Sequence, residues 1–210
     1  MLSTNIKRAA IILAVCASLK PAVPAAPHFP EAAPPAPLGL PPMIWPLENP
    51  YSAQKAELGW ILFYDARLSR DGTQSCMSCH SPGAAFTDGR KVSIGVGGQM
   101  GTRNSPTVVN AAYNAVQLRD GRARLLETQC LLALNTPREM GLEDSTLVEI
   151  LSAIPEYRKR FRTAFARDRI SSLLVSRALA TFERLVVSGD SAYDRFVAGD
   201  KTALTESQQR

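Results

Sequence analysis

Five consecutive residues in the first half of the chain, Cys76 to His80, could attach a redox cofactor covalently. They read Cys-Met-Ser-Cys-His, the C-x-x-C-H spacing of c-type haem attachment. Two thiols at this spacing reach the two vinyl groups on one edge of a porphyrin, and the histidine that follows is held where its imidazole binds iron. We therefore predict one covalent haem c, attached through Cys76 and Cys79, with His80 as the iron ligand.

A C-x-x-C pair can also form a disulfide, a redox dithiol or half of a zinc site. Zinc would need further cysteine or histidine ligands nearby, and this part of the sequence has none. A dithiol motif would not require His80. Another cysteine, Cys130, lies in an apolar stretch, and we expect it to be a buried, unreactive thiol.

The face of the haem iron opposite His80 is expected to be open. The chain has two histidines, and His28 lies in a proline-rich segment, so the folded part offers no second imidazole. A haem that reacts with peroxide needs such an exchangeable sixth position. The alternative is a thioether ligand from Met100 or Met140, which would make the haem a six-coordinate electron carrier.

Residues 1–25 have the pattern of a secretory signal peptide. Lys7 and Arg8 precede a short apolar run that stops at Lys20, whereas a membrane-spanning helix needs roughly 20 apolar residues. An uncleaved membrane anchor is the alternative, and Cys16 only faintly resembles a lipidation site. We predict export across the inner membrane to the periplasm, the compartment in which haem c is attached.

Residues 26–46 form a Pro/Ala-rich leader, and residues 47–210 form the folded domain. Eleven of the 15 prolines lie between Pro21 and Pro50. Because proline removes backbone donors and fixes φ, we expect a flexible or polyproline-like leader. The net charge of +5 falls to +2 without the three cations of residues 1–25, which argues against a nucleic-acid partner.

Beyond the leader, apolar residues recur at helical spacing, and no stretch shows the period of two that is typical of a strand. We predict a mostly α domain built around the haem. The segment from Asp65 to Asn110 is expected to be a long ordered loop held by the cofactor. The predicted helices are Ala53–Tyr64 with Ser52 as N-cap, Ala123–Leu134, one opened by a capping box at Thr146–Glu149, one starting at Pro155, Ser171–Val187, and Ser191–Ala198.

A series of motifs surrounds the attachment sequence: Leu58–Ser69, Ser75–His80, Arg103–Thr107, Asn110–Tyr113, Asp120–Ala123, Leu126–Gln129, Glu139–Gly141, Phe182–Arg184 and Ser191–Phe196. In this order they resemble the bacterial di-haem cytochrome c peroxidases, the family that includes MauG. Those proteins have two cytochrome-c-like domains, each with its own haem, and the resemblance covers the first, peroxide-reacting one. The second haem domain is absent here, which implies a fragment, a truncated gene or a partner that supplies the second haem.

The resemblance also implies which residues act on peroxide. It assigns acid–base catalysis to Glu139 and the role of polar neighbour above the iron to Gln129. Cleaving the O–O bond requires moving a proton from the iron-bound oxygen to the leaving oxygen, which a carboxylate can do. In many family members a loop histidine caps the resting haem, and Val96 stands at that place here, as expected for an always-open haem of the MauG type.

Two more positions gain meaning from the resemblance. Asn104 matches an asparagine at a calcium site between the two haem domains. Calcium takes six to eight oxygens, and the other protein ligands belong to the absent domain, so we expect weak or no calcium binding by this chain. The family's aromatic pair before Asp-Gly-Arg, ending in an electron-carrying tryptophan, is replaced by Leu118 and Arg119, which argues against electron transfer between haems through this position.

These observations predict a periplasmic peroxidase domain that reduces hydrogen peroxide with electrons from a small redox protein, a cytochrome c or a cupredoxin. MauG-like oxidation of a protein partner is a variant within the same class. The alternatives are a monohaem electron carrier without peroxidase activity and a non-catalytic remnant that only binds haem. A high-spin ferric spectrum would favour the peroxidase, and a low-spin His/Met spectrum the carrier.

Overall fold

The computed structural model describes residues 25–210, so all but the last residue of the predicted signal peptide, Cys16 included, lies outside the described residues. The mostly α prediction is confirmed: in this part of the chain the only β features are three isolated bridges. None of the described helices combines the length and apolar character needed to cross a membrane.

The helices are α2 (Ala53–Tyr64), α3 (Cys76–Cys79), α4 (Leu126–Asn135), α5 (Asp144–Ala153), α6 (Pro155–Phe165), α7 (Ser172–Glu183), α8 (Ala192–Val197) and α9 (Glu206–Gln209). Short 3-10 turns lie at Ala66–Leu68, Pro82–Ala84, Val96–Gly98 and Ala111–Tyr113.

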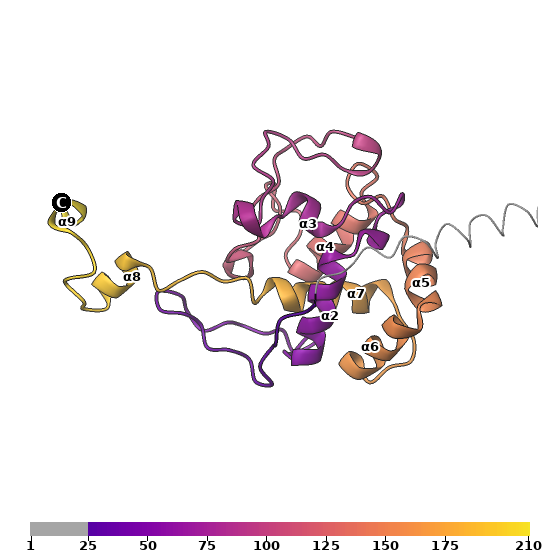
Figure 1. The fold of residues 1–210 in the computed structure, drawn as a ribbon, viewed down its shortest axis with the longest axis horizontal. Coiled ribbons are helices and arrows are strands. Elements are labelled where there is room, and N and C mark those ends of the chain that lie inside the picture. Colours follow the sequence, from indigo (N-terminus) through magenta and orange to yellow (C-terminus); the bar gives the residue numbers. More distant parts are fainter. Residues whose placement is uncertain (1–24) are drawn as a thin grey trace, which may run out of the picture.

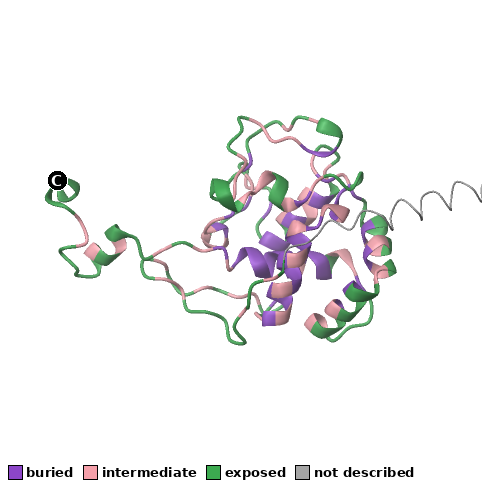
Figure 2. Ribbon diagram, in the orientation of Figure 1, coloured by how far each residue is buried: buried purple, intermediate pink, exposed green. Residues whose placement is uncertain are grey.

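Helices α2 and α7 cross at the centre of the molecule and make its most extensive helix–helix contact (Figures 1 and 2). Helix α2 begins as predicted, because the Ser52 side chain accepts a hydrogen bond from the backbone of Lys55. The two helices approach closely at Gly59, where a Cβ atom would lie 1.9 Å from the carbonyl oxygen of Ala178. Helices α4, α5 and α6 pack around this pair and complete one core.

We expect Gly59→Ala to lower the free energy of unfolding by about 3 kcal/mol, in the upper part of the range for overpacked cores. The added methyl group meets backbone of α7, which cannot move aside as a side chain could. Denaturant unfolding followed by circular dichroism measures the effect. Gly83→Ala is the matched control, because the nearest atom to its Cβ would lie 3.9 Å away; equal stabilities of the two variants would contradict the close-packing argument.

Three helix boundaries differ by two or more residues from the sequence prediction. Helix α4 begins at Leu126 rather than Ala123, because the carbonyl of Ala123 accepts from the backbone of Gln117 in an extended bridge. Helix α5 begins at Asp144, ahead of the predicted capping box, without a side-chain cap. Helix α7 ends at Glu183 instead of Val187, since the carbonyl of Val186 accepts from the backbone of Asn110 in the long loop.

The Pro/Ala-rich leader has no helix or strand in the described residues, yet it lies against the helical body. Phe29 packs on the core, and the carbonyl of Leu38 accepts a 2.7 Å hydrogen bond from the backbone of Asp190. Figure 1 shows the leader running beside the segment that leads to α8. Tertiary contacts therefore hold a segment whose composition alone suggested flexibility.

The long loop is anchored where it leaves α2. Asp65 is fully buried, binds the guanidinium of Arg67 through both carboxylate oxygens and accepts a hydrogen bond from the hydroxyl of Tyr157 on α6. Further along, the loop closes on itself through backbone bonds between Ser93 and both Gly101 and Arg103. This ordered loop forms one side of a cavity that also contacts helices α4 and α7.

Candidate functional site

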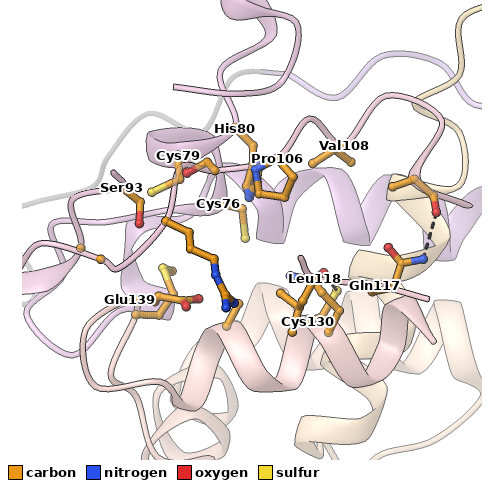
Figure 3. Close-up of a pocket in the computed structure, with 18 of the residues that line it drawn as sticks. Cys76, Cys79, His80, Ser93, Pro106, Val108, Gln117, Leu118, Cys130 and Glu139 are labelled. Carbon is orange, nitrogen blue, oxygen red and sulfur yellow. Dashed lines mark hydrogen bonds between the residues drawn. The ribbon is translucent and has the colours of Figure 1, made fainter. Parts of the chain in front are cut away.

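A cavity that is open to solvent lies between the long loop and helices α4 and α7. Cys76, Cys79 and His80 form part of its wall. Figure 3 shows these three residues on one side, with Cys130 of α4 and Glu139 on the side that faces them. The cavity therefore places the attachment sequence opposite the residues that the family resemblance associates with peroxide.

The two thiols are positioned by α3, a helix of a single turn. Its start is tied by a 3.0 Å hydrogen bond from the backbone of Ser75 to the Ser78 hydroxyl, and its end by a bond from the backbone of His80 to the Cys76 carbonyl. Both thiols are free, and both line the cavity. Burial raises the pKa of each thiol, so both stay protonated at neutral pH and resist oxidation to a disulfide.

The imidazole of His80 is oriented by the loop that follows it. Its Nδ1 lies 3.1 Å from the carbonyl oxygen of Phe86, and donation of the Nδ1 hydrogen leaves Nε2 free for a metal. Ala85 and Phe86 both adopt left-handed backbone conformations, which turn this carbonyl toward the ring. Burial lowers the pKa of His80, so the neutral form that binds iron prevails at pH 7.

These residues fit a c-type haem. Two free thiols and a neutral imidazole share one wall of a cavity that is mostly apolar and open to solvent. The zinc alternative finds no support, because within residues 25–210 no group of three or more His, Cys, Asp or Glu side chains could hold a metal ion. Haem iron needs only the single imidazole on this side.

Glu139 and Gln129 both line the same cavity, as the resemblance implies. Gln129 comes from α4 and Glu139 from the loop after it. Burial raises the pKa of Glu139, and the nearby Arg122 partly offsets this increase. The carbonyl of Glu139 accepts a 2.9 Å hydrogen bond from the backbone of Val96, so the loop around Val96 holds the segment that carries the acid.

The two methionines considered as a sixth iron ligand differ in position. Met100 is 64% exposed and does not line the cavity. Met140 is buried and does line it. The electron-carrier alternative therefore depends on Met140.

Asn104 and Arg119 contact each other at the mouth of the cavity. The guanidinium of Arg119 donates a 3.0 Å hydrogen bond to the side-chain oxygen of Asn104. That oxygen is the one a calcium ion would need, and here it accepts from Arg119. Weak or no calcium binding by this chain stays a prediction.

Two cavity residues were missed as site residues by sequence reasoning. Glu183, at the end of α7, lines the cavity and is 6% exposed. Cys130 is buried, as predicted, but it also lines the cavity. A signal for Glu183 exists in the sequence, because it falls four and eight residues after Leu179 and Val175 on the buried stripe of α7.

The mostly α fold and the cavity walled by a C-x-x-C-H segment define a c-type haem domain. A sequence profile of the di-haem cytochrome c peroxidases matches residues 53–202, and the chain belongs to this family. The methylamine utilization protein MauG of Methylophilus methylotrophus is 42% identical over 165 residues, which cover 79% of this chain and 49% of that protein. The cytochrome c551 peroxidase of Nitrosomonas europaea is 38% identical over 160 residues, which cover 76% and 48%.

A solved structure supports the same assignment. The crystal structure of a MauG-like protein associated with microbial copper homeostasis superposes with a TM-score of 0.72 at 38% identity, covering 86% of this chain and 52% of that chain. This chain thus spans about half the length of the relatives that it matches. Haem c is the cofactor of the family, and Cys76, Cys79 and His80 are the residues that would hold it here.

Proposed function

We propose that this chain is a periplasmic haem peroxidase domain that reduces hydrogen peroxide with electrons from a small redox protein, a cytochrome c or a cupredoxin. The supporting observation is that Glu139 and Gln129 share one cavity with Cys76, Cys79 and His80. Haem c, when attached, supplies a redox-active iron. Two electrons and two protons then convert one peroxide molecule into two water molecules.

The protein's own part in this reaction is to bind the cofactor and move protons. His80 holds the iron from one side, with its ring fixed by the carbonyl of Phe86. Glu139 takes a proton from one peroxide oxygen and returns it to the other, a task suited to a carboxyl whose pKa is raised by burial. The amide of Gln129 donates a hydrogen bond that orients the peroxide.

We also propose that this chain carries one haem and works with a second haem domain, supplied by a longer form of the chain or by a partner. The family's members in the comparison are about twice as long as the matched region. Electron entry through Arg119 is ruled out by its chemistry, because guanidinium is not oxidisable at accessible potentials. Electrons must therefore enter by another route.

MauG-like oxidation of a protein partner is the second candidate function. It is favoured by Val96, which stands where many family members carry a capping histidine, as expected for an always-open haem of the MauG type. In this variant the oxidising equivalents of peroxide are delivered to a partner protein. An assay that compares peroxide consumption with and without a reduced cytochrome separates the two functions. Consumption that requires the reduced cytochrome indicates the peroxidase, and oxidation of a partner protein without that donor indicates the MauG-like activity.

The test is to produce the full chain, with the predicted signal peptide of residues 1–25, in a bacterium that attaches haem c. The protein is then recovered from the periplasm. We expect a pigment that survives acid–acetone extraction, a high-spin ferric spectrum, and peroxide-dependent oxidation of a reduced cytochrome c or cupredoxin. Cys76→Ser/Cys79→Ser is the control and should yield no covalent pigment. Colourless protein would overturn the proposal, and a low-spin His/Met spectrum without turnover would replace it with the electron carrier.

A further inference from the structure

Glu183 is a buried acid inside the haem cavity that the proposed peroxide chemistry does not use. Its side chain is almost entirely buried, and it lines the same cavity as Cys76 and His80. It lies at the C-terminal end of α7, on the stripe that faces the core. A carboxyl in such a place normally has a cationic partner, because burying an unpaired charge is costly.

The cation that could pair with Glu183 is engaged elsewhere. The neighbouring Arg184 binds both carboxylate oxygens of Glu127, at 2.7 and 3.0 Å. Glu127 also accepts a 2.8 Å bond from Asn49. The only side-chain hydrogen bond to Glu183 in the described structure comes from the thiol of Cys130, at 3.7 Å. The carboxyl is therefore buried beside a weak donor, with no counter-charge of its own.

The titratable and charged groups around Glu183 come from four parts of the chain. Helix α4 contributes Glu127 and Cys130, the haem-attachment helix α3 contributes Cys76, and Arg184 follows directly after α7. Lys55 of α2 is close enough to interact electrostatically with both Arg184 and Glu127. Burial raises the pKa of Glu183 to about 7, Glu127 adds to this increase, and Cys130 and Arg184 oppose it.

We propose that Glu183 is a redox-linked proton site of this domain: its carboxyl takes up a proton when the haem iron accepts an electron, and releases it when the iron is oxidised. One electron comes from a one-electron donor of the small-redox-protein class, and one proton comes from solvent through the open side of the cavity. Ferric haem carries one more positive charge than ferrous haem, so it favours the ionised carboxylate. The two equilibria are coupled through this charge, and the coupling is reciprocal.

The direction of the effect follows from this coupling. The pKa of Glu183 is higher when the haem is ferrous than when it is ferric. The midpoint reduction potential of the haem therefore falls with rising pH only between these two pKa values. There each electron brings one proton, and the midpoint potential falls by about 59 mV per pH unit, the value for a tenfold change in a one-electron equilibrium. Below both pKa values, and above both, the contribution of Glu183 is constant.

The experiment is a spectroscopic redox titration of the haem-loaded full chain between about pH 5 and pH 9, where a carboxyl of such raised pKa titrates. We expect a pH-dependent segment close to neutrality in the wild-type protein and its loss in Glu183→Gln. The glutamine variant should match the wild-type potential at low pH, where both side chains are neutral, and lie above it at high pH. Glu183→Asp should keep a pH-dependent segment, because it keeps the carboxyl.

Glu139→Gln is the matched control, since it removes the other acid that lines the cavity. It should retain the pH-dependent segment. If the segment instead persists in Glu183→Gln, the linked proton belongs to another group, such as Glu139 or a haem propionate, and the inference is wrong. The inference rests on the haem of the proposed function but not on peroxide turnover. Absence of attached haem would overturn both. If haem is attached but the pH dependence of its midpoint potential is the same in the wild type and in Glu183→Gln, only this inference is overturned.

Discussion

Replacing Glu139 with glutamine is expected to slow peroxide reduction about 100- to 10,000-fold, the usual contribution of a general acid–base group. Glutamine keeps the size and polarity of the side chain but cannot shuttle a proton between the two peroxide oxygens. Haem content and the ferric spectrum should stay unchanged, because Glu139 lies across the cavity from the attachment sequence (Figure 3). Stopped-flow mixing of the ferric protein with peroxide measures the rate directly.

The same residue sets a pH dependence. The ionised carboxylate is the form that accepts the first proton, so the rate should fall as pH falls through the pKa of Glu139. Because burial raises this pKa, the fall should occur at higher pH than for an exposed glutamate. Glu143→Gln is the matched control, since Glu143 is an exposed acid four residues further on. Equal rates for the wild type and Glu139→Gln would remove Glu139 from the mechanism.

Arg184→Met is expected to lower the free energy of unfolding by about 3–5 kcal/mol, the typical cost of breaking a buried ion pair from one side. The side chains of Arg184 and Glu127 are 6% and 11% exposed. Without the guanidinium, Glu127 keeps only Asn49 as a side-chain donor, and the two buried carboxyls, Glu127 and Glu183, lose the cation that interacts with both. Chemical denaturation at pH 7 measures the loss.

The double variant Glu127→Gln/Arg184→Met separates two contributions to the loss of unfolding free energy: a buried carboxylate without a cationic partner, and lost side-chain packing. Removing the charge of Glu127 should restore most of the stability, because methionine fills much of the space of arginine. Burial raises the pKa of Glu127, but Arg184 and Asn49 more than offset this, so its net pKa is lowered. The stability that the pair contributes should therefore be lost as pH falls into the acid range. A double variant as unstable as the single one would show that packing dominates.

The sequence by itself determined the attachment chemistry and the local helices. Cys76, Cys79 and His80 need only each other, because their spacing matches the edge of a porphyrin whatever surrounds them. Ser52 and Pro155 likewise mark helix starts through local backbone chemistry, and both begin helices in the structure as predicted. Such features depend on residues a few positions apart, which a single sequence displays directly.

Only the tertiary structure decided how distant residues share a site. The family resemblance named Glu139 and Gln129, but periodicity could not place them opposite His80, since the loop path between them has no repeating pattern. Contacts between segments far apart in the chain decide three further features: where α7 ends, how the leader packs at Asp190, and the ion pair of Arg184 with Glu127. For the same reason the sequence does not distinguish Glu183 from other residues on the buried side of a helix. Only the structure shows that it lines the haem cavity without a cationic partner of its own. A charge acquires its pKa from its three-dimensional neighbours, and those become visible only in the folded protein.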